Sequence, residues 1–269
     1  MKLKNKVAII TGAGRGLGRS SAVAMAREGA SVVILSRTPS ELAETAGLIE
    51  SEGGKALALK ADISVPADMD EVISETISIF GRIDILMNNA AEVGPVGLLT
   101  DIDEEEWSRM MDVNLNGVLL CCKAVVPHLS RQKGGKIINV TSGLADIVMP
   151  PLGAYSISKA ALNHLTRVMA EELRAHNIQV NALDPGIMDT AMQEELRDMG
   201  PEVLGEALFN QFMEFKEEGH LKSPDDIAQL AVFLASSSSD DITGEIGSEQ
   251  DFMGYGYGVE PETPGESDQ

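Results

Sequence analysis

The chain is poor in the side chains that bind metals or form redox pairs. Its 269 residues include only two cysteines, Cys121 and Cys122, which are adjacent in an apolar, helix-like stretch. In that setting cysteine behaves as a small buried hydrophobic residue. The four histidines show no ligand spacing with one another or with cysteine. We therefore expect no metal site.

Cations are also scarce, since 21 Lys and Arg face 42 Asp and Glu, for a net charge of -21. Nucleic acids and anionic membranes bind basic surfaces, so we expect neither as a partner. No window approaches the roughly 18 uninterrupted apolar residues of a membrane span. The amino terminus, MKLKNKVAIIT, enters a strand-like run without a small-residue cleavage site. These features indicate a cytoplasmic protein.

A glycine-rich turn follows the first strand-like run. The apolar residues 7–11 precede TGAGRGLG and a helix-like segment that ends at Gly29. A strand, a glycine turn and a helix in that order form a phosphate cradle, because the helix amino terminus offers free N–H groups to an anion. The spacing is Thr-Gly-x-x-x-Gly-x-Gly, with glycines at Gly12, Gly16 and Gly18, rather than G-x-G-x-x-G.

A second informative stretch is TSGLADIVMPPLGAYSISK, residues 141–159. It places Ser142 just after the apolar run KIINV, and Tyr155 and Lys159 four positions apart on one helix face. An adjacent ammonium stabilises a phenolate and lowers the tyrosine pKa toward the working range. The pair therefore suits acid/base chemistry, although the spacing taken alone is more often that of a solvated helix face.

These motifs together resemble the short-chain dehydrogenase/reductase family, and within it the 3-oxoacyl-acyl-carrier-protein reductase branch. The resemblance covers about residues 6–244. It implies an α/β fold in which residues 1–257 form one Rossmann-type domain, a doubly wound parallel sheet flanked by helices. It also implies a homo-oligomer, dimer or tetramer, although the stretch after Gly244 lacks the family's usual Asp-Gly-Gly ending. We expect residues 258–269 to form a flexible acidic tail.

By the same resemblance, the catalytic set is Asn114, Ser142, Tyr155 and Lys159. Ser142 would bind the substrate oxygen, Tyr155 would act as acid or base, and Lys159 would hold the nicotinamide ribose. Asn114 would hold a water molecule that links Lys159 to solvent. Two alternatives stay open: Ser142 as a plain turn residue, and Asn114 as a residue that only satisfies backbone groups.

The end of the second strand bears on the choice of cofactor. A carboxylate there binds the ribose hydroxyls of NAD, whereas SVVILSR ends in Ser36 and Arg37. Arg15, in the glycine turn, is a second cation. Two guanidiniums suit a 2′-phosphate, so we expect NADP(H) rather than NAD(H). The alternative is that Arg37 only opens the next helix.

The remaining cofactor contacts come from the resemblance. Asp62 and Ile63, after the third strand, would cap the adenine, although Asp62 could be an ordinary turn acid. In Asn88-Asn89-Ala90-Ala91 an alanine replaces the family's glycine. The full predicted set is Gly12, Arg15, Gly16, Leu17, Gly18, Arg37, Asp62, Ile63, Asn89, Ala90, Tyr155, Lys159, Pro185, Gly186, Ile187 and Thr190.

Residues 191–222 are rich in Met and Phe. Such a segment is either core packing or, as in the family, an apolar substrate lid. We therefore expect an NADP(H)-dependent oxidoreductase acting on a small-molecule ketone or secondary alcohol, with 3-oxoacyl thioester reduction as one possibility. The alternatives are a cofactor-binding regulatory or structural protein without turnover, and an NAD-dependent dehydrogenase of a sugar, polyol or steroid.

Overall fold

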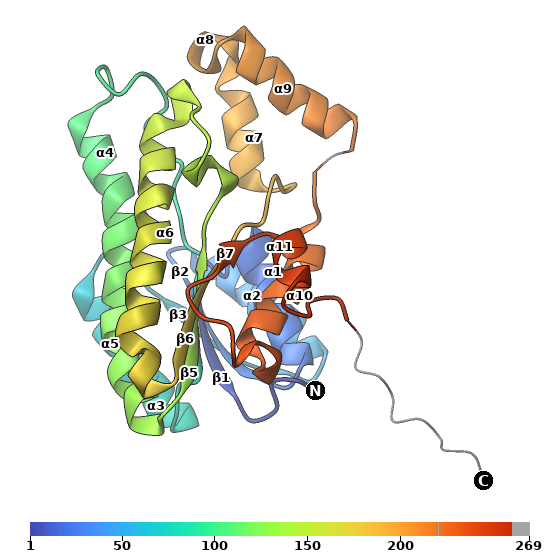
Figure 1. Cartoon of the computed structure of the whole chain (residues 1–269). Helices are drawn as coiled ribbons and strands as arrows, with labels where there is room; N and C mark the ends of the chain where they lie inside the picture. The colour runs from blue at the N-terminus through green and yellow to red at the C-terminus, as the bar shows by residue number, and fades with distance from the viewer. Residues whose placement is uncertain (220, 260–269) are drawn as a thin grey trace.

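A computed structural model describes residues 1–219 and 221–259. At its centre is a seven-stranded parallel sheet with the order β3-β2-β1-β4-β5-β6-β7 (Figure 1). The chain order reverses between β1 and β4, which confirms the expected doubly wound, Rossmann-type fold. The strands are β1 Val7–Thr11, β2 Ser31–Ser36, β3 Lys55–Lys60, β4 Ile85–Asn88, β5 Gly135–Val140, β6 Ile178–Leu183 and β7 Ile246–Gly247.

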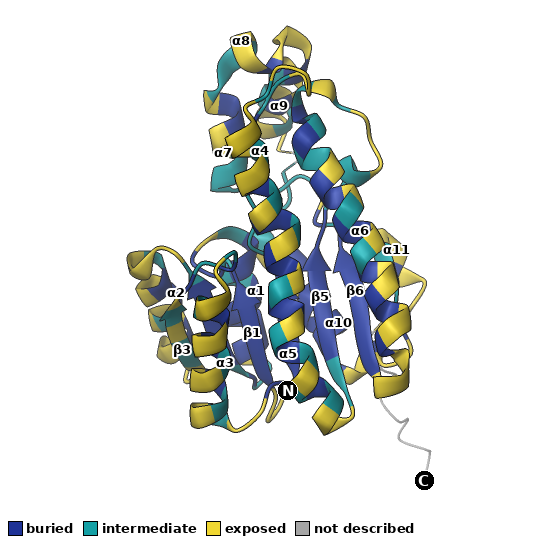
Figure 2. Cartoon of the chain, turned by 90° about the vertical axis from the view of Figure 1, so that its left-hand side faces the viewer, coloured by how far each residue is buried: buried dark blue, intermediate teal, exposed yellow. Residues whose placement is uncertain are grey.

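The central strands are apolar runs because helices cover both faces of the sheet. Every residue of β1 and β4 is buried. Along β1 the side chains alternate between the two faces, so that Ile9 and Ile10 belong to different hydrophobic clusters. The edge strand β3 alternates between exposed and partly buried residues instead. The core therefore consists of two apolar layers, one on each side of the sheet (Figure 2).

The helices form two layers and one upper segment (Figure 1). Helices α1, α2 and α10 contribute to the cluster on one face, and α3, α5 and α6 to the cluster on the other. The α-helices are α1 Gly16–Arg27, α2 Pro39–Ser51, α3 Pro66–Phe80, α4 Glu104–Met111, α5 Val118–Gln132, α6 Gly153–Leu173, α7 Ala191–Asp198, α8 Gly200–Leu204, α9 Glu206–Glu217, α10 Pro224–Ala235 and α11 Glu249–Met253. A π-helical turn, Asp112–Gly117, joins α4 to α5, and short 3₁₀ turns span Gly143–Ala145, Pro150–Leu152, Arg174–His176 and Ser237–Ser239.

Helix α5 carries the cysteine pair. Cys121 and Cys122 are fully buried and free, as the sequence predicts, and pack with Val125 and Leu129. The continuous helical stretch Glu104–Gln132 is long enough to cross a membrane and contains an 18-residue window with a mean hydropathy of 1.2. A core helix passes the same test, and 44% of that window is buried inside the fold, so the stretch is weak evidence for a membrane contact.

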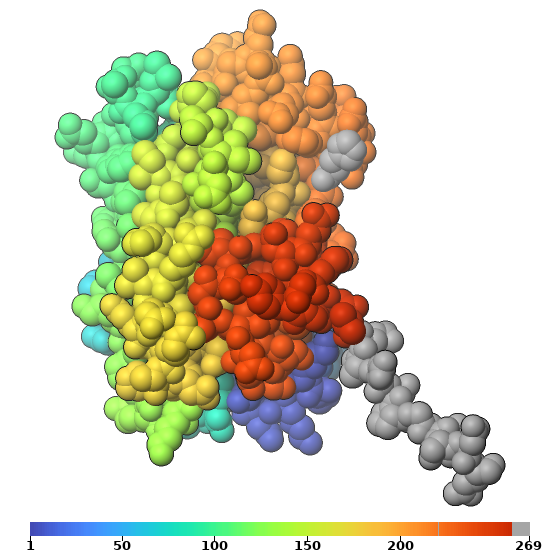
Figure 3. Space-filling model, in the orientation of Figure 1, coloured from blue at the N-terminus to red at the C-terminus, as the bar shows by residue number. Residues whose placement is uncertain are grey.

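Helices α7, α8 and α9 stand above the carboxyl ends of the strands; we call residues 191–217 the upper segment (Figures 2 and 3). Leu196, Leu204 and Phe212 of this segment form an apolar cluster with Val93 and Leu152 of the body. Four further Met and Phe side chains of the upper segment pack against this cluster: Met192, Met199, Phe209 and Phe215. These side chains therefore pack a small core of their own.

The carboxyl-terminal part differs from the family pattern, as the sequence indicates. Strand β7 is two residues long and pairs in parallel with β6. Helix α11 follows at once, and a capping box between Ser248 and Asp251 starts it. In Figure 3 this part of the chain lies beside α6. Most of the expected tail at 258–269 lies outside the described residues.

Candidate active site

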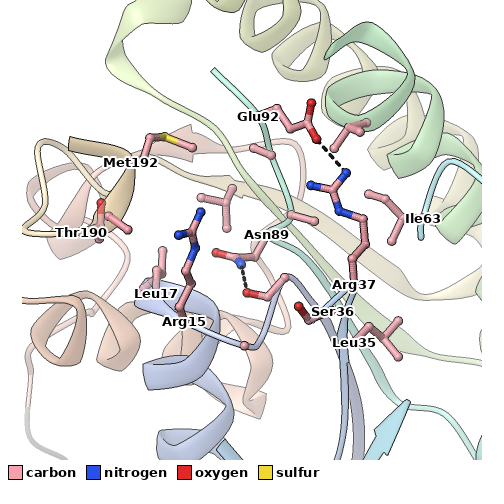
Figure 4. A pocket seen from close by; sticks show the side chains of 18 of the residues that line it. Arg15, Leu17, Leu35, Ser36, Arg37, Ile63, Asn89, Glu92, Thr190 and Met192 are labelled. Carbon is pink, nitrogen blue, oxygen red and sulfur yellow. Dashed lines mark hydrogen bonds and ion pairs between the residues drawn. The ribbon is translucent and has the colours of Figure 1, made fainter. Parts of the chain in front are cut away.

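A cleft of about 360 Å³ opens at the carboxyl ends of the strands, between β1, β4 and the start of α7 (Figure 4). The glycine turn forms its floor. Gly12 and Gly16 have φ of 64° and 54°, values that side chains other than glycine rarely adopt. A Cβ on Gly12 would lie 2.8 Å from the Cα of Ala90, so the turn packs directly against the Asn-Asn-Ala motif.

Gly18 has a packing role instead of lining the cleft. A Cβ at this position would overlap the carbonyl oxygen of Gly12 and the amide of Asn89. That amide donates to the carbonyl oxygens of Thr11 and Gly12, at 2.9 and 3.1 Å. Asn89 therefore ties the end of β4 to the end of β1 and leaves room only for glycine at the first turn of α1.

The amino terminus of α1 is open to the cleft. Arg15 is the residue before the helix, and its side chain forms no capping hydrogen bond. The first backbone N–H groups of a helix lack partners within the helix, so they favour an anion. Gly14, Gly16 and Leu17 line the cleft at this point. A cofactor diphosphate fits this end of the cleft.

The two cations predicted to hold a 2′-phosphate both contact carboxylates. The guanidinium of Arg15 lies 3.0 Å from Glu195 of α7. Nη1 of Arg37 lies 2.8 Å from Oε1 of Glu92, which is buried in the cleft wall (Figure 4). That oxygen accepts no hydrogen bond of good geometry, so the attraction is electrostatic. The other oxygen of Glu92 accepts a 3.1 Å hydrogen bond from Arg109 of α4.

A second carboxylate lies near the same end of the cleft. A Cβ on Gly14 would lie 2.7 Å from Oε2 of Glu41 and 3.1 Å from the hydroxyl of Ser36. Glu41 and Glu92 both line the cleft. The region expected to be cationic is therefore of mixed charge. Local motif reading missed Glu92 even though it follows the Asn-Asn-Ala-Ala run, because its partner comes from β2, far away in the sequence.

Asp62 and Ile63 line the cleft at its adenine end, where the resemblance puts them. Asp62 also accepts hydrogen bonds from the N–H and hydroxyl of Ser64, at 2.9 and 2.6 Å. Burial alone would raise the pKa of Asp62, but the hydrogen bonds from Ser64 lower it below its usual range. The cleft position and the turn-acid alternative are therefore both compatible with the geometry.

At the other end of the cleft, α6 brings Tyr155 and Lys159 together. Nζ of Lys159 lies 5.5 Å from the centroid of the Tyr155 ring and donates to the carbonyl oxygen of Val140 at 2.8 Å. Lys159 is only 2% exposed, and burial lowers its pKa to about 8. The Ser142 hydroxyl accepts from the N–H of Leu144 at 3.2 Å and lies near enough to Tyr155 to lower the pKa of the phenol.

The pKa of Tyr155 differs from the expectation. Burial raises it to about 12, the hydrogen bond from Ser142 opposes that rise, and the nearby Asp184 carboxylate adds to it. The Lys159 ammonium does not dominate the pKa of Tyr155, because it lies over the face of the ring and donates its hydrogen bond to the carbonyl oxygen of Val140. Asp184, which precedes Pro185 at the end of β6, is a residue that our sequence reading missed.

Asn114 lies in the π-helical turn between α4 and α5. Its Oδ1 accepts from the backbone N–H of Glu92 at 2.9 Å, and its Nδ2 donates to the carbonyl oxygen of Glu92 at 2.8 Å. Nδ2 also donates to the hydroxyl of Ser158 at 3.1 Å. The side chain thus satisfies backbone groups of the loop after β4, which is one of the two roles left open.

The cleft collects most of the predicted site. The lining includes Gly12, Arg15, Gly16, Leu17, Arg37, Asp62, Ile63, Asn89, Ala90, Tyr155, Lys159, Pro185 and Thr190. Five predicted residues are outside this lining: Gly18, Asn114, Ser142, Gly186 and Ile187. The glycine cradle, the open helix terminus and the elongated lining fit a dinucleotide. Residues 1–219 and 221–259 contain no group of three or more His, Cys, Asp or Glu side chains that could hold a metal ion.

Comparisons with known proteins agree with this geometry. Residues 6–200 match the family model described as short chain dehydrogenase. Subunit BbsD of a hydroxy(phenyl)methylsuccinyl-CoA dehydrogenase from Thauera aromatica is 36% identical, covering 91% of this chain and 95% of that protein. A 3-oxoacyl-acyl-carrier-protein reductase from Thermotoga maritima is 33% identical over 91% and 96% of the two chains.

The fold comparison points the same way. The crystal structure of a short-chain dehydrogenase/reductase from Burkholderia xenovorans superposes with a TM-score of 0.83, at 29% identity, covering 92% of this chain and 95% of that one. The family match spans well over half of the chain, and the glycine turn, Tyr155 and Lys159 line one cleft. The chain belongs to the short-chain dehydrogenase/reductase family of oxidoreductases.

Proposed function

We propose that the protein transfers a hydride between NADP(H) and a ketone or secondary alcohol, with Tyr155 as the acid/base. The observation that carries this proposal is the meeting of Ser142, Tyr155 and Lys159 at the end of the cleft that Pro185 and Thr190 also line. The phenol and the ammonium come from α6, and Ser142 caps the short turn that follows β5.

The protonation state of Tyr155 suits the proton transfer that carbonyl reduction needs. With its pKa raised to about 12, Tyr155 carries its proton at neutral pH and can donate it to a carbonyl oxygen. Ser142 would donate a hydrogen bond to the same carbonyl oxygen of the substrate. Lys159 would bind the nicotinamide ribose and supply positive charge near Tyr155. A bound nicotinamide cofactor supplies the hydride.

NADP(H) is proposed because Arg37 ends β2 beside Ser36, where NAD-binding relatives of this fold place a carboxylate. To hold a 2′-phosphate, Arg37 must leave Glu92 and form paired, charge-assisted hydrogen bonds with the phosphate. The second candidate is an NAD-dependent dehydrogenase of a sugar, polyol or steroid. Glu41 and Glu92 favour it, because carboxylates in the cleft wall accept from ribose hydroxyls and repel a phosphate.

For the substrate we propose an acyl thioester with an oxo or hydroxy group on the acyl chain. The support is the likeness to the two relatives above, named for a hydroxyacyl-CoA dehydrogenase and a 3-oxoacyl-carrier reductase. The upper segment, with residues up to 222, would cover this substrate as a lid. Its apolar cluster and the Met192 side chain beside Thr190 suit an acyl chain (Figure 4).

We further propose a cytoplasmic homo-oligomer. Exposed apolar side chains support the assembly: Ile157 and Val168 are 41% and 40% exposed on α6, and Leu119 is 41% exposed on α5. Ile157 and Val168 are eleven positions apart, so they share one side of the helix. Light scattering on the purified protein tests this; a monomer at micromolar concentration would reject it.

The experiment that tests the function is a substrate panel with NADPH and with NADH, followed by the absorbance of the reduced nicotinamide. The panel contains acetoacetyl thioesters, simple ketones, sugars and steroids. Turnover of thioesters with NADPH is the expected result. A preference for NADH would move the assignment to the second candidate. Tight NADPH binding without turnover of any compound would reject the enzyme proposal.

A further inference from the structure

A buried arginine in the upper segment has no partner for its charge. Arg197 of α7 is 7% exposed, and both Nη1 and Nη2 are buried without a hydrogen-bond acceptor. Over the part of the chain that the structure describes, it takes part in no ion pair or ring contact either. A guanidinium cannot give up its proton in a protein, so this site keeps a buried positive charge.

The same side of α7 carries a second unpartnered polar group. Gln193 precedes Arg197 by four positions, so the two side chains are neighbours on the helix surface, about 6 Å apart along its axis. Oε1 of Gln193 is also buried and without a partner. Buried polar groups in folded proteins are normally satisfied, and each exception calls for a ligand, an ion or a functional explanation.

The acidic residues of α7 do not neutralise this arginine. Glu194, Glu195 and Asp198 are exposed, and Glu195 contacts Arg15 at the glycine turn instead. The net charge of -21 also means that anions are repelled from most of the surface. An anion that reaches Arg197 would therefore be held by this local cation rather than by a general basic field.

The position of α7 connects these two residues to the active site. The helix starts directly after Thr190, and its first two residues, Ala191 and Met192, line the same cleft as Tyr155 (Figure 4). From there α7 leads into the upper segment, where Leu196 joins the apolar cluster. Gln193 and Arg197 are not among the residues that line the cleft, so a ligand with its carbonyl at Tyr155 would have to extend along α7 to reach them.

We propose that Arg197, assisted by Gln193, binds an oxyanion of the substrate, carboxylate or phosphate, at a distance from the reacting carbonyl. This inference rests on the proposed function and narrows its substrate class to anionic carbonyl compounds. The planar fork of the guanidinium matches a carboxylate or phosphate in two parallel hydrogen bonds. Gln193, turned to present its amide nitrogen, adds a further donor.

The first test compares matched substrates with and without the anion. Wild type and Arg197→Met are assayed with NADPH on 5-oxohexanoate and on its methyl ester. We expect the variant to lose kcat/KM on the acid by about 10- to 100-fold, the range for a hydrogen bond to a charged group, and to keep its rate on the ester. Lys216→Met, which removes an exposed charge from the same segment, should behave as wild type on both.

A second pair of substrates separates the two sources of the oxyanion. Acetoacetyl-CoA carries phosphates, whereas the acetoacetyl thioester of N-acetylcysteamine does not. A loss confined to the CoA thioester in Arg197→Met identifies phosphate, and a loss confined to 5-oxohexanoate identifies carboxylate. An equal loss on charged and neutral substrates, or no loss on any of them, overturns the proposal.

Thermal unfolding supplies a readout that does not need turnover, so it still decides the question if the proposed reaction fails. Without ligand, Arg197→Met should have a higher Tm than wild type, because the substitution removes a buried unpaired charge. Hexanoate, or inorganic phosphate, should raise the Tm of wild type and not that of the variant. A lower Tm in Arg197→Met that Arg197→Lys restores, with no response of wild type to either anion, would show a purely structural arginine.

Discussion

Nη1 of Arg37, at the end of β2, lies 2.8 Å from Oε1 of Glu92, in the loop that follows β4. The arginine expected to bind a cofactor phosphate thus contacts a carboxylate from the loop after β4, a strand that β1 separates from β2 in the sheet. Arg37 is more than half exposed, so water weakens this pair, and a phosphate can compete for the guanidinium. We therefore expect Glu92 to affect the affinity of the cleft for NADPH.

Glu92→Gln should bind NADPH more tightly. The substitution removes the competing charge and keeps the backbone groups of residue 92 that Asn114 contacts. Since exposed pairs contribute up to about 1 kcal/mol, we expect the KM for NADPH to fall about three- to fivefold. The KM for NADH should stay unchanged, because NADH has no 2′-phosphate. Glu106→Gln, on the exposed face of α4, is the control, and equal changes for both cofactors would refute this role.

Asp184→Asn should shift the pH dependence of alcohol oxidation. Besides burial, the Asp184 carboxylate raises the pKa of Tyr155. Removing that charge lowers the pKa, so the phenolate needed to take the alcohol proton forms at lower pH. We expect the rising limb of kcat/KM against pH to move to lower pH. Asp189→Asn changes an exposed acid of the same loop, and it should leave the profile in place.

Lys159→Met should change the pH dependence of stability. The pKa of Lys159 is lowered by burial to about 8 in the folded chain, from 10.5 as the ordinary value. The unfolded chain therefore binds the extra proton between these pH values, and the destabilising charge is fully present below about pH 8. Relative to the variant, wild type should gain free energy of unfolding as the pH rises through this window.

Urea titrations at several pH values from 7 to 10 measure this difference. Lys123→Met removes an exposed lysine from α5 and should differ from wild type by a constant amount over the same range. If the difference between wild type and Lys159→Met is equally constant, Lys159 does not carry a depressed pKa in solution.

Two glycine substitutions test the packing of the glycine turn. Gly18→Ala should destabilise the fold by about 1–3 kcal/mol or more, because its Cβ would overlap the Gly12 carbonyl and the Asn89 amide. Gly47→Ala, inside α2 with nothing within 4 Å of the new Cβ, should stabilise by about 0.5–1 kcal/mol. Denaturant unfolding of both variants checks the pair, and a neutral Gly18→Ala would contradict the close approach.

The fold and the two ends of the cleft were predictable because their signals are local. Apolar runs such as VAIIT mark strands that helices bury on both faces, and the glycine turn marks a phosphate cradle. The start of α10 has a local signal of the same kind, since Ser223 accepts a hydrogen bond from the N–H of Asp225 and Pro224 is the first helical residue.

The electrostatics of the cleft were not predictable from local motifs, because they depend on residues that only the tertiary fold brings together. Glu92 meets Arg37 across two strands, and Asp184 approaches Tyr155 from a third. The same reason explains the pKa of Tyr155. Its spacing to Lys159 was predicted correctly, but burial raises the pKa more than the Lys159 ammonium lowers it. Burial without a partner, as at Arg197, likewise has no signature in the sequence.

The most direct test of the account is Tyr155→Phe, measured by turnover and by NADPH binding on the same protein sample. We predict a fall in kcat of about 100- to 10,000-fold, the usual contribution of a general acid, with NADPH binding retained. Tyr255→Phe, which changes an exposed tyrosine on the turn after α11, should leave both unchanged. Full activity in Tyr155→Phe would contradict the assignment of Tyr155 as the acid/base.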